Sequence, residues 1–166
     1  SNSAVQKINS FLSILKVKKN EEDINSFDIS DKQKCFIIKV KNKFESYWSQ
    51  EKGGSFFSYL KKFKDIKKVD LYPDSLDLDK DKVISFFSQF IFGINLKSYT
   101  FNKYKTLERE KINQKINFKI VSKDKEKIEK KYKYYDAIKE GVFLSRDLVS
   151  EPPNILNPKK YTEEIK

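Results

Sequence analysis

Two kinds of hydrophobic pattern alternate along this chain of 166 residues. Four short runs are rich in β-branched and aromatic residues or alternate between apolar and polar residues, as strands do. They are residues 11–17, 35–40, 68–72 and 115–121. Between them, apolar residues recur at helical spacing over 46–63 and 83–94, while the polar and acidic residues 21–31 predict a loop or an edge segment. This alternation predicts an α/β fold in which helical crossovers join parallel strands of a layered sheet.

The last helical pattern is the clearest. Its apolar residues recur at helical spacing and form one stripe: Ile128, Tyr132, Tyr135, Ile138, Val142 and Val149. The opposite face consists of lysine and glutamate, so the stripe predicts a helix packed on the sheet, with Ile138 and Val142 buried. Gly141 lies beside the stripe, where its missing side chain predicts a close approach by a neighbouring backbone. Pro152 and Pro153 end the helix, because proline lacks an N–H and disfavours helical geometry in the residue before it.

Three shorter features each have a structural and a functional interpretation. Gly53–Gly54 interrupts the pattern of 46–63 and indicates either a break between two turns or close packing of this helix on the sheet. Asp77, Asp79 and Asp81 precede a helix and are interpreted as helix-capping residues, since a calcium loop also needs its glycine and a distal glutamate. Cys35 lies in an apolar run and is interpreted as a small buried residue rather than a reactive thiol.

Composition excludes several kinds of chemistry. The chain contains no histidine, which excludes Ser-His-Asp and Cys-His catalysis within it and removes the commonest zinc ligand. Its single cysteine excludes an internal disulfide. Length and 38% hydrophobic residues predict one packed domain, and no apolar run approaches the roughly 20 residues of a membrane span. We expect a cytoplasmic protein. The absence of methionine suggests that residues 1–4 include a cloning scar and that the chain is part of a longer protein.

The net charge of +11 favours contact with nucleic acid, but the kind of charge does not. Lysine supplies all but two of the 35 positive charges, and Arg109 and Arg146 are the only arginines. Base recognition and phosphate binding favour arginine, and a lysine-rich composition fits an AT-rich genome equally well. We therefore expect a solvated lysine surface with weak, non-specific affinity for nucleic acid.

Two stretches resemble the leucyl (cytosol) aminopeptidases, a family of two-metal exopeptidases. Residues 135–164, YDAIKEGVFLSRDLVSEPPNILNPKKYTEE, resemble the junction at which a helix ending in an A-R-D-L-like sequence, followed by N-x-P-x-N-x-x-x-P, leads from the N-terminal to the catalytic domain. Residues 92–105, FGINLKSYTFNKYK, are similar to the family's x-G-x-x-L-x-x-Y-x-F-x-x-Y-K pattern. Glu51-Lys52-Gly53-Gly54 is a third, weaker similarity. Arg146 and Asp147 are interpreted as residues that fix the junction.

The resemblance implies a macro-domain-like layered sheet with helices on both faces. Residues 5–150 would form the N-terminal non-catalytic domain, and residues 151–166 would begin the catalytic domain. The parent enzyme would release N-terminal residues from peptides with two zinc or manganese ions, as a homohexamer with its N-terminal domains outside. The family's metal-binding strings do not occur here, so the expectation is that this chain holds no catalytic, cofactor-binding or metal-binding residue.

Two other functions stay open at this stage. One is a basic nucleic-acid-binding module, which rests on the net charge. The other is a degenerate macro-like domain that serves only protein contacts. After residues 35–40 the family shows a glycine-rich turn, whereas this chain has Lys39-Val40-Lys41-Asn42-Lys43, which weakens a nucleotide-binding interpretation.

Overall fold

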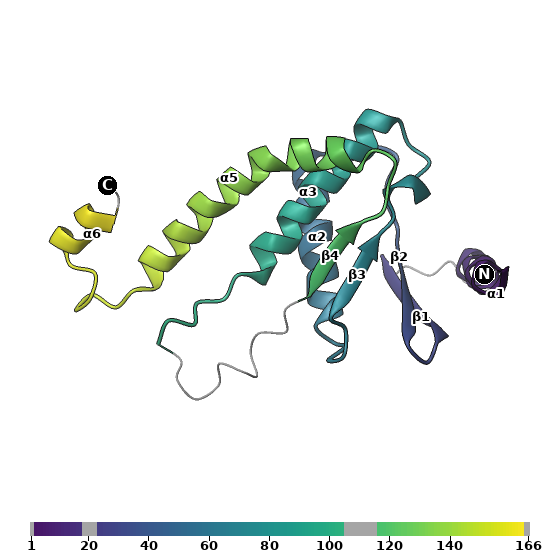
Figure 1. Ribbon diagram of the computed structural model, residues 1–166, viewed down its shortest axis with the longest axis horizontal. Helices are drawn as coiled ribbons and strands as arrows, with labels where there is room; N and C mark the ends of the chain where they lie inside the picture. Colours follow the sequence, from purple (N-terminus) through teal and green to yellow (C-terminus); the bar gives the residue numbers. More distant parts are fainter. Residues whose placement is uncertain (1, 18–22, 105–115, 165–166) are drawn as a thin grey trace. The chain divides into compact units, whose positions relative to one another are not determined.

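The computed structural model describes residues 2–17, 23–104 and 116–164, and it divides into two compact units, Ser1–Lys41 and Asn42–Lys166 (Figure 1). The first unit contains α1 (Asn2–Val17), β1 (Ile24–Ser30) and β2 (Gln33–Ile38). The second contains α2 (Ser46–Leu60), β3 (Lys68–Leu71), the short 3₁₀ helix η1 (Pro73–Ser75), α3 (Lys80–Ser98), β4 (Asn117–Ile120), α5 (Lys125–Ser150) and α6 (Pro158–Glu164). From β2 to α5 the described strands and α-helices follow the predicted order, and the α/β class is confirmed.

The first unit corrects two predictions about its elements. Residues 11–17 belong to helix α1 and not to a strand, and Phe11 stacks on Phe27 of β1 at 4.3 Å between ring centroids. A short apolar run cannot distinguish a strand from a helix by its pattern alone. The polar stretch 21–31 contains the strand β1, paired antiparallel with the predicted strand β2, so the loop interpretation is wrong and the edge-strand alternative holds. Residues 21 and 22 lie outside the described residues.

The second unit contains the predicted parallel pair. Strand β3 pairs in parallel with β4, which places Val69 opposite Phe118 and Leu71 opposite Ile120. Val69 and Leu71 are buried and their neighbours are exposed, as the alternating pattern predicts. Helix α3 connects the two strands along the chain, which is the connection that parallel strands require. The prediction that the second strand begins at Lys115 falls outside the described residues.

Helices α2 and α3 meet backbone to backbone at two glycines. A Cβ atom built on Gly53 would lie 2.0 Å from the carbonyl oxygen of Phe90, and one built on Gly93 would lie 1.9 Å from that of Gln50. Real Cβ atoms do not approach other atoms so closely, so only glycine fits at either position. The close-packing interpretation of Gly53 is confirmed, although its neighbour is helix α3 and not the sheet.

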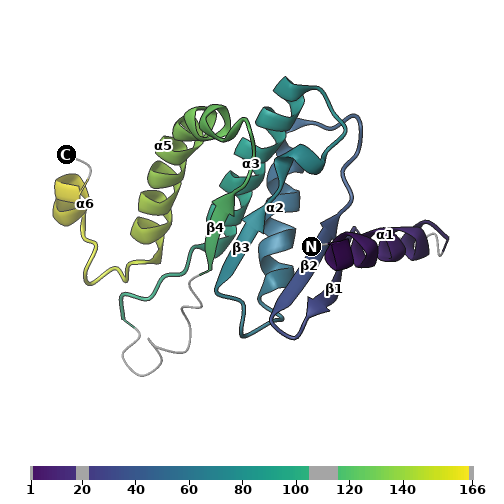
Figure 2. The same ribbon diagram turned by 45° about the vertical axis from the view of Figure 1, so that its right-hand side comes forward.

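Helix α3 is buried on nearly all sides, because α2 packs on one side and α5 on another (Figure 2). Ser88 and Gln89 lie off the predicted apolar stripe, yet both are buried. The Ser88 hydroxyl donates to the carbonyl oxygen of Ile84 at 2.7 Å, and the Gln89 side-chain oxygen accepts from Ser46 at 2.8 Å. Small polar residues enter the interior here because their hydrogen bonds are satisfied there.

The predicted long helix is present as α5, but only the first half of the predicted stripe, Ile128, Tyr132 and Tyr135, packs against α3. Ile128 is fully buried, whereas 37% of Ile138 and 87% of Val149 are exposed, and Val142 is half-buried. No atom lies within 4 Å of a Cβ built on Gly141, so the predicted close approach there is wrong. None of the described helices has the length and hydrophobicity of a transmembrane span.

Residues with polar tips form much of the contact between α5 and α3. The Asn95 side-chain NH₂ donates to the hydroxyl of Tyr132 at 2.9 Å, and burial together with the Asp136 carboxylate raises the pKa of Tyr132 to about 12. Within α5, Lys139 is only 17% exposed and donates to Asp136 at 2.7 Å. Such a side chain buries its apolar stem and keeps its tip bonded, so a pattern of apolar residues includes Tyr132 but misses Lys139.

The glycine contact predicts opposite effects for two neighbouring substitutions. Gly53→Ala should lower the free energy of unfolding by about 1–3 kcal/mol, since the new methyl group must displace the α3 backbone. Gly54→Ala is the matched control, because its Cβ would lie 3.8 Å from the nearest atoms, and alanine favours helix by up to about 1 kcal/mol. Urea unfolding of both variants measures the difference. Equal stability of the two variants would show that α2 and α3 do not meet at Gly53.

Candidate functional site

The three closely spaced aspartates do not form a metal site. Asp79 occupies the N-cap position of α3, as predicted, but its side chain makes no capping hydrogen bond and instead contacts Lys82 at 2.7 Å. Asp81 lies in the first turn of α3, where a negative charge is favourable. Over residues 2–17, 23–104 and 116–164, no group of three or more His, Cys, Asp or Glu side chains comes together to hold a metal ion.

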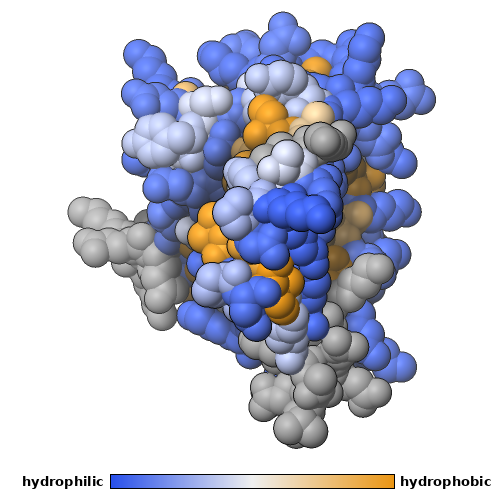
Figure 3. All heavy atoms as spheres, turned by 90° about the vertical axis from the view of Figure 1, so that its left-hand side faces the viewer, coloured by the Kyte–Doolittle hydropathy of each residue, from blue (hydrophilic) through white to orange (hydrophobic). Residues whose placement is uncertain are grey.

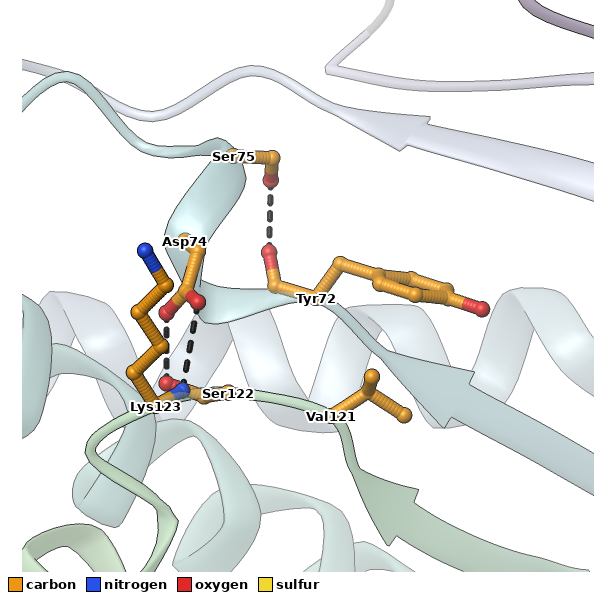
Figure 4. A pocket seen from close by; sticks show the side chains of 6 residues that line it. All are labelled: Tyr72, Asp74, Ser75, Val121, Ser122 and Lys123. Carbon is orange, nitrogen blue, oxygen red and sulfur yellow. Dashed lines mark hydrogen bonds between the residues drawn. The ribbon is translucent and has the colours of Figure 1, made fainter.

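A groove lies at the carboxyl ends of the parallel strands, the place where α/β sheets commonly bind ligands. It measures about 580 Å³ and is lined by Tyr72, Asp74, Ser75, Val121, Ser122 and Lys123 (Figure 4). Its polar groups are bonded to one another: Asp74 accepts from the Ser122 hydroxyl at 2.5 Å and from the Lys123 N–H at 3.2 Å, and the Ser75 hydroxyl donates to the Tyr72 carbonyl oxygen. These bonds hold the two strand-to-helix turns together, and they lower the pKa of Asp74.

The environment of Cys35 disfavours a reactive thiolate. Cys35 lies in β2 opposite Phe27 and is partly buried. Burial raises the pKa of its thiol, which keeps the sulfur in its less nucleophilic neutral form. The sequence prediction of a small, structural cysteine agrees with this environment.

Polar side chains gather where α3 ends beside the last turns of α5. The Arg146 guanidinium donates to the carbonyl oxygen of Leu96 at 2.7 Å and lies over the ring of Tyr99 at 5.3 Å. The Tyr99 hydroxyl donates to Asp147 at 2.6 Å. Arg146 thus satisfies one of the last carbonyl groups of α3, which have no partner inside their own helix. The structural interpretation of Arg146 and Asp147 is confirmed, but the helix end that Arg146 completes is that of α3.

Glu151 forms a second connection one residue beyond α5. Its carboxylate accepts hydrogen bonds from the Lys103 ammonium and from the Tyr104 hydroxyl. Only 7% of the glutamate side chain is exposed. The two donors, Lys103 first and Tyr104 second, hold the pKa of Glu151 below its usual range, while the carboxylate raises the pKa of Lys103.

The two sequence stretches that carry the family resemblance therefore form one structure. Tyr99, Lys103 and Tyr104 come from residues 92–105, and Arg146 with its neighbours comes from residues 135–164. We call this set of contacts the α3–α5 junction. Sequence reasoning did not identify Glu151, and its partners are 47 and 48 residues away along the chain. The one local signal is an acid placed directly before the proline pair that ends the helix.

The α3–α5 junction predicts a specific dependence of stability on pH. The folded pKa of Glu151 is depressed, so its stabilising contribution is complete above the ordinary glutamate value of 4.5 and is lost as pH falls through the folded pKa. Glu151→Gln should therefore unfold with a shallower loss of stability below that value than the unchanged chain. Urea unfolding over a series of pH values compares them, with Glu129→Gln as the control for an exposed glutamate. Parallel pH profiles for all three proteins would contradict the depressed pKa.

Comparison with known proteins places this fold. No protein-family model matches the chain. The probable cytosol aminopeptidase of Phytoplasma mali is 36% identical over 118 residues, which cover 69% of this chain and 23% of that protein. The probable cytosol aminopeptidase of Agrobacterium fabrum is 34% identical over 61% of this chain and 21% of its own length. The chain thus spans about a fifth to a quarter of these curated relatives.

A solved structure shares the fold over almost the whole chain. A mutant of tomato leucine aminopeptidase aligns with a TM-score of 0.72 and 20% identity, and the alignment covers 95% of this chain and 32% of that one. Sequence relatives and fold agree with the resemblance carried by the residues of the α3–α5 junction. The chain belongs to the leucyl (cytosol) aminopeptidase family, in which it is the N-terminal domain.

Proposed function

We propose that this chain is the non-catalytic N-terminal domain of a metal-dependent exopeptidase that releases N-terminal residues from peptides. The observation that carries the proposal is the α3–α5 junction, in which the two family-like stretches contact each other. The relatives named cytosol aminopeptidase support the same activity for a parent protein. Residues 5–150 would form the domain, and residues 151–166 would begin the catalytic domain.

The described residues do not suit a two-metal site. Three carboxylates of the second unit are engaged elsewhere: Asp74 and Glu151 hold chain segments together, and Asp79 contacts Lys82. The chain contains no histidine. The two zinc or manganese ions of the parent would therefore be bound by the catalytic domain, and no step of peptide hydrolysis is assigned to this chain.

The domain would act as a peripheral cover of a cytoplasmic homohexamer. Its own catalytic domain is the first partner that we propose, and peptides would reach the parent enzyme as substrates. A domain outside the assembled catalytic core would influence access to the active sites and assembly. By itself, this chain should be mainly monomeric.

The proposal that only the catalytic domain hydrolyses peptides predicts the outcome of an activity assay. This chain should hydrolyse neither leucine amide nor leucyl peptides, with or without added zinc or manganese. The parent polypeptide should hydrolyse both, and a chelator should abolish that activity. Colorimetric release of leucine measures both proteins side by side. Metal-dependent turnover by this chain, lost when its own Asp79 and Asp81 are changed to Asn, would overturn the proposal.

The lysine surface predicts weak contact with nucleic acid. Acidic neighbours accompany the lysines at the start of α5: Asp124 lies 3.8 Å from Lys127, and Glu129 lies 3.6 Å from Lys125. We therefore expect dissociation constants no tighter than about 10⁻⁴–10⁻⁶ M at physiological salt, without sequence preference. Fluorescence titration of a labelled duplex and a labelled single strand at two salt concentrations tests this. Sub-micromolar, sequence-selective binding that survives physiological salt would favour a nucleic-acid-binding module instead.

A further inference from the structure

The second half of α5 turns an uncharged face away from α3. We call it the outer face of α5, and it consists of Tyr134, Ala137, Ile138, Gly141, Leu144, Ser145, Leu148 and Val149. Its members recur at intervals of three and four residues, so they lie on one side of the helix. All are exposed except the half-buried Leu148, with exposed fractions of 69% for Tyr134, 45% for Leu144 and 87% for Val149.

This face has few unsatisfied polar groups to hinder burial. The Ser145 hydroxyl donates to the Gly141 carbonyl oxygen at 2.9 Å, inside the helix. Its other side chains are apolar apart from the Tyr134 hydroxyl at one end. Figure 3 shows hydrophobic residues between hydrophilic ones on the side of the molecule where α6 lies. Several exposed apolar residues on one face of a helix mark an interaction site more often than an isolated exposed residue does.

The centre of the face is shaped for another helix. Gly141 lies between Ala137 and Ser145, each one turn away, so three small residues follow one line along α5. The same chain already uses glycine for helix contact, because Gly53 and Gly93 bring α2 and α3 backbone to backbone. At Gly141 the corresponding space is open. The position therefore offers a depression bordered by Leu144 and Ile138, into which a helix with small or apolar side chains fits.

The relatives indicate what covers this face. The fold of this chain makes up 32% of the tomato leucine aminopeptidase chain, and the Phytoplasma relative is more than four times as long as the part that matches. In such proteins most of the polypeptide is additional to this domain. The outer face continues to Val149, immediately before the segment that would begin the next domain, so the following chain emerges beside it.

We propose that the outer face of α5 is the surface on which an apolar helix from the remaining, catalytic part of the parent polypeptide docks. This inference rests on the proposed function, since it requires a parent with a second domain. A second copy of the same chain is a poorer occupant, because each copy carries a net charge of +11 and the two would repel each other. Docking of the parent's own domain is intramolecular, so a high effective concentration favours it even in dilute solution.

Hydrogen exchange tests the proposal in the parent protein and in this chain alone. Backbone amides of residues 137–149 should exchange at least about tenfold more slowly in the parent, because docking suppresses local opening of α5. Gly141→Leu should remove that protection by filling the depression. In this chain alone the same variant should melt no lower than the unchanged chain, since nothing lies within 4 Å of the new Cβ and leucine favours helix over glycine. Glu129→Leu, on α5 but outside the outer face, is the matched control and should leave the protection intact.

The possible outcomes separate this proposal from the proposed function. If the amides of residues 137–149 exchange as fast in the parent as in this chain alone, and the parent hydrolyses leucyl peptides, the docking surface is refuted and the proposed function is not. Protection that Gly141→Leu removes, in a parent without peptidase activity, would support the docking surface and overturn the function. Sedimentation of this chain alone gives the third result: a dimer that Gly141→Leu dissociates would overturn the parent's domain as the occupant in favour of a second copy.

Discussion

Helices α2 and α3 pack at the distance that two glycines permit, and the second unit is arranged around that contact. With Gly53 against the Phe90 carbonyl group and Gly93 against that of Gln50, the two backbones touch, and larger residues lie to either side of the crossing. Phe56 and Phe90 then meet at 5.7 Å between ring centroids, next to Phe86. A side chain at either glycine would separate the helices and open this aromatic core, where close packing contributes much of the stability.

Because α2 occupies one side of α3, the other side is free to receive α5, and the two contacts differ in chemistry. The first depends on apolar rings and backbone proximity. The second adds to ring contacts, such as Phe92 with Tyr135, hydrogen bonds from side chains: Asn95 with Tyr132, and Arg146 with the backbone carbonyl group of Leu96. Half-exposed polar contacts of this kind add less stability each than buried rings, yet they fix the position of α5 along α3. The α3–α5 junction is where this positioning is strongest.

Sequence patterns predicted helices α2, α3 and α5 and the parallel strand pair, because periodicity directly reflects which side of an element is buried. They failed where burial does not follow polarity. Residues 11–17 are apolar on more than one side, which suits a strand or a helix equally, and the burial of Ser88 became intelligible only with its hydrogen bonds in view. The stripe on α5 was right in its first half, where Ile128 is buried and Tyr132 bonds Asn95, but it was extended too far, since Ile138 and Val149 are exposed. In the candidate site, Arg146 could be interpreted from its motif, whereas the partners of Glu151 required the fold.

The bonds of Glu151 also have a mechanical consequence. A pull on the chain beyond Pro153 would not simply unwind α5 from its end, since Glu151 is held by Lys103 and Tyr104, and Arg146 is held by the end of α3. The load would pass into the segment after α3 and from there into the aromatic core. Helix α5 would then move as one rigid element that is held at its C-terminal end. Movement of the segment after the proline pair would tilt the whole helix rather than unwind its last turn.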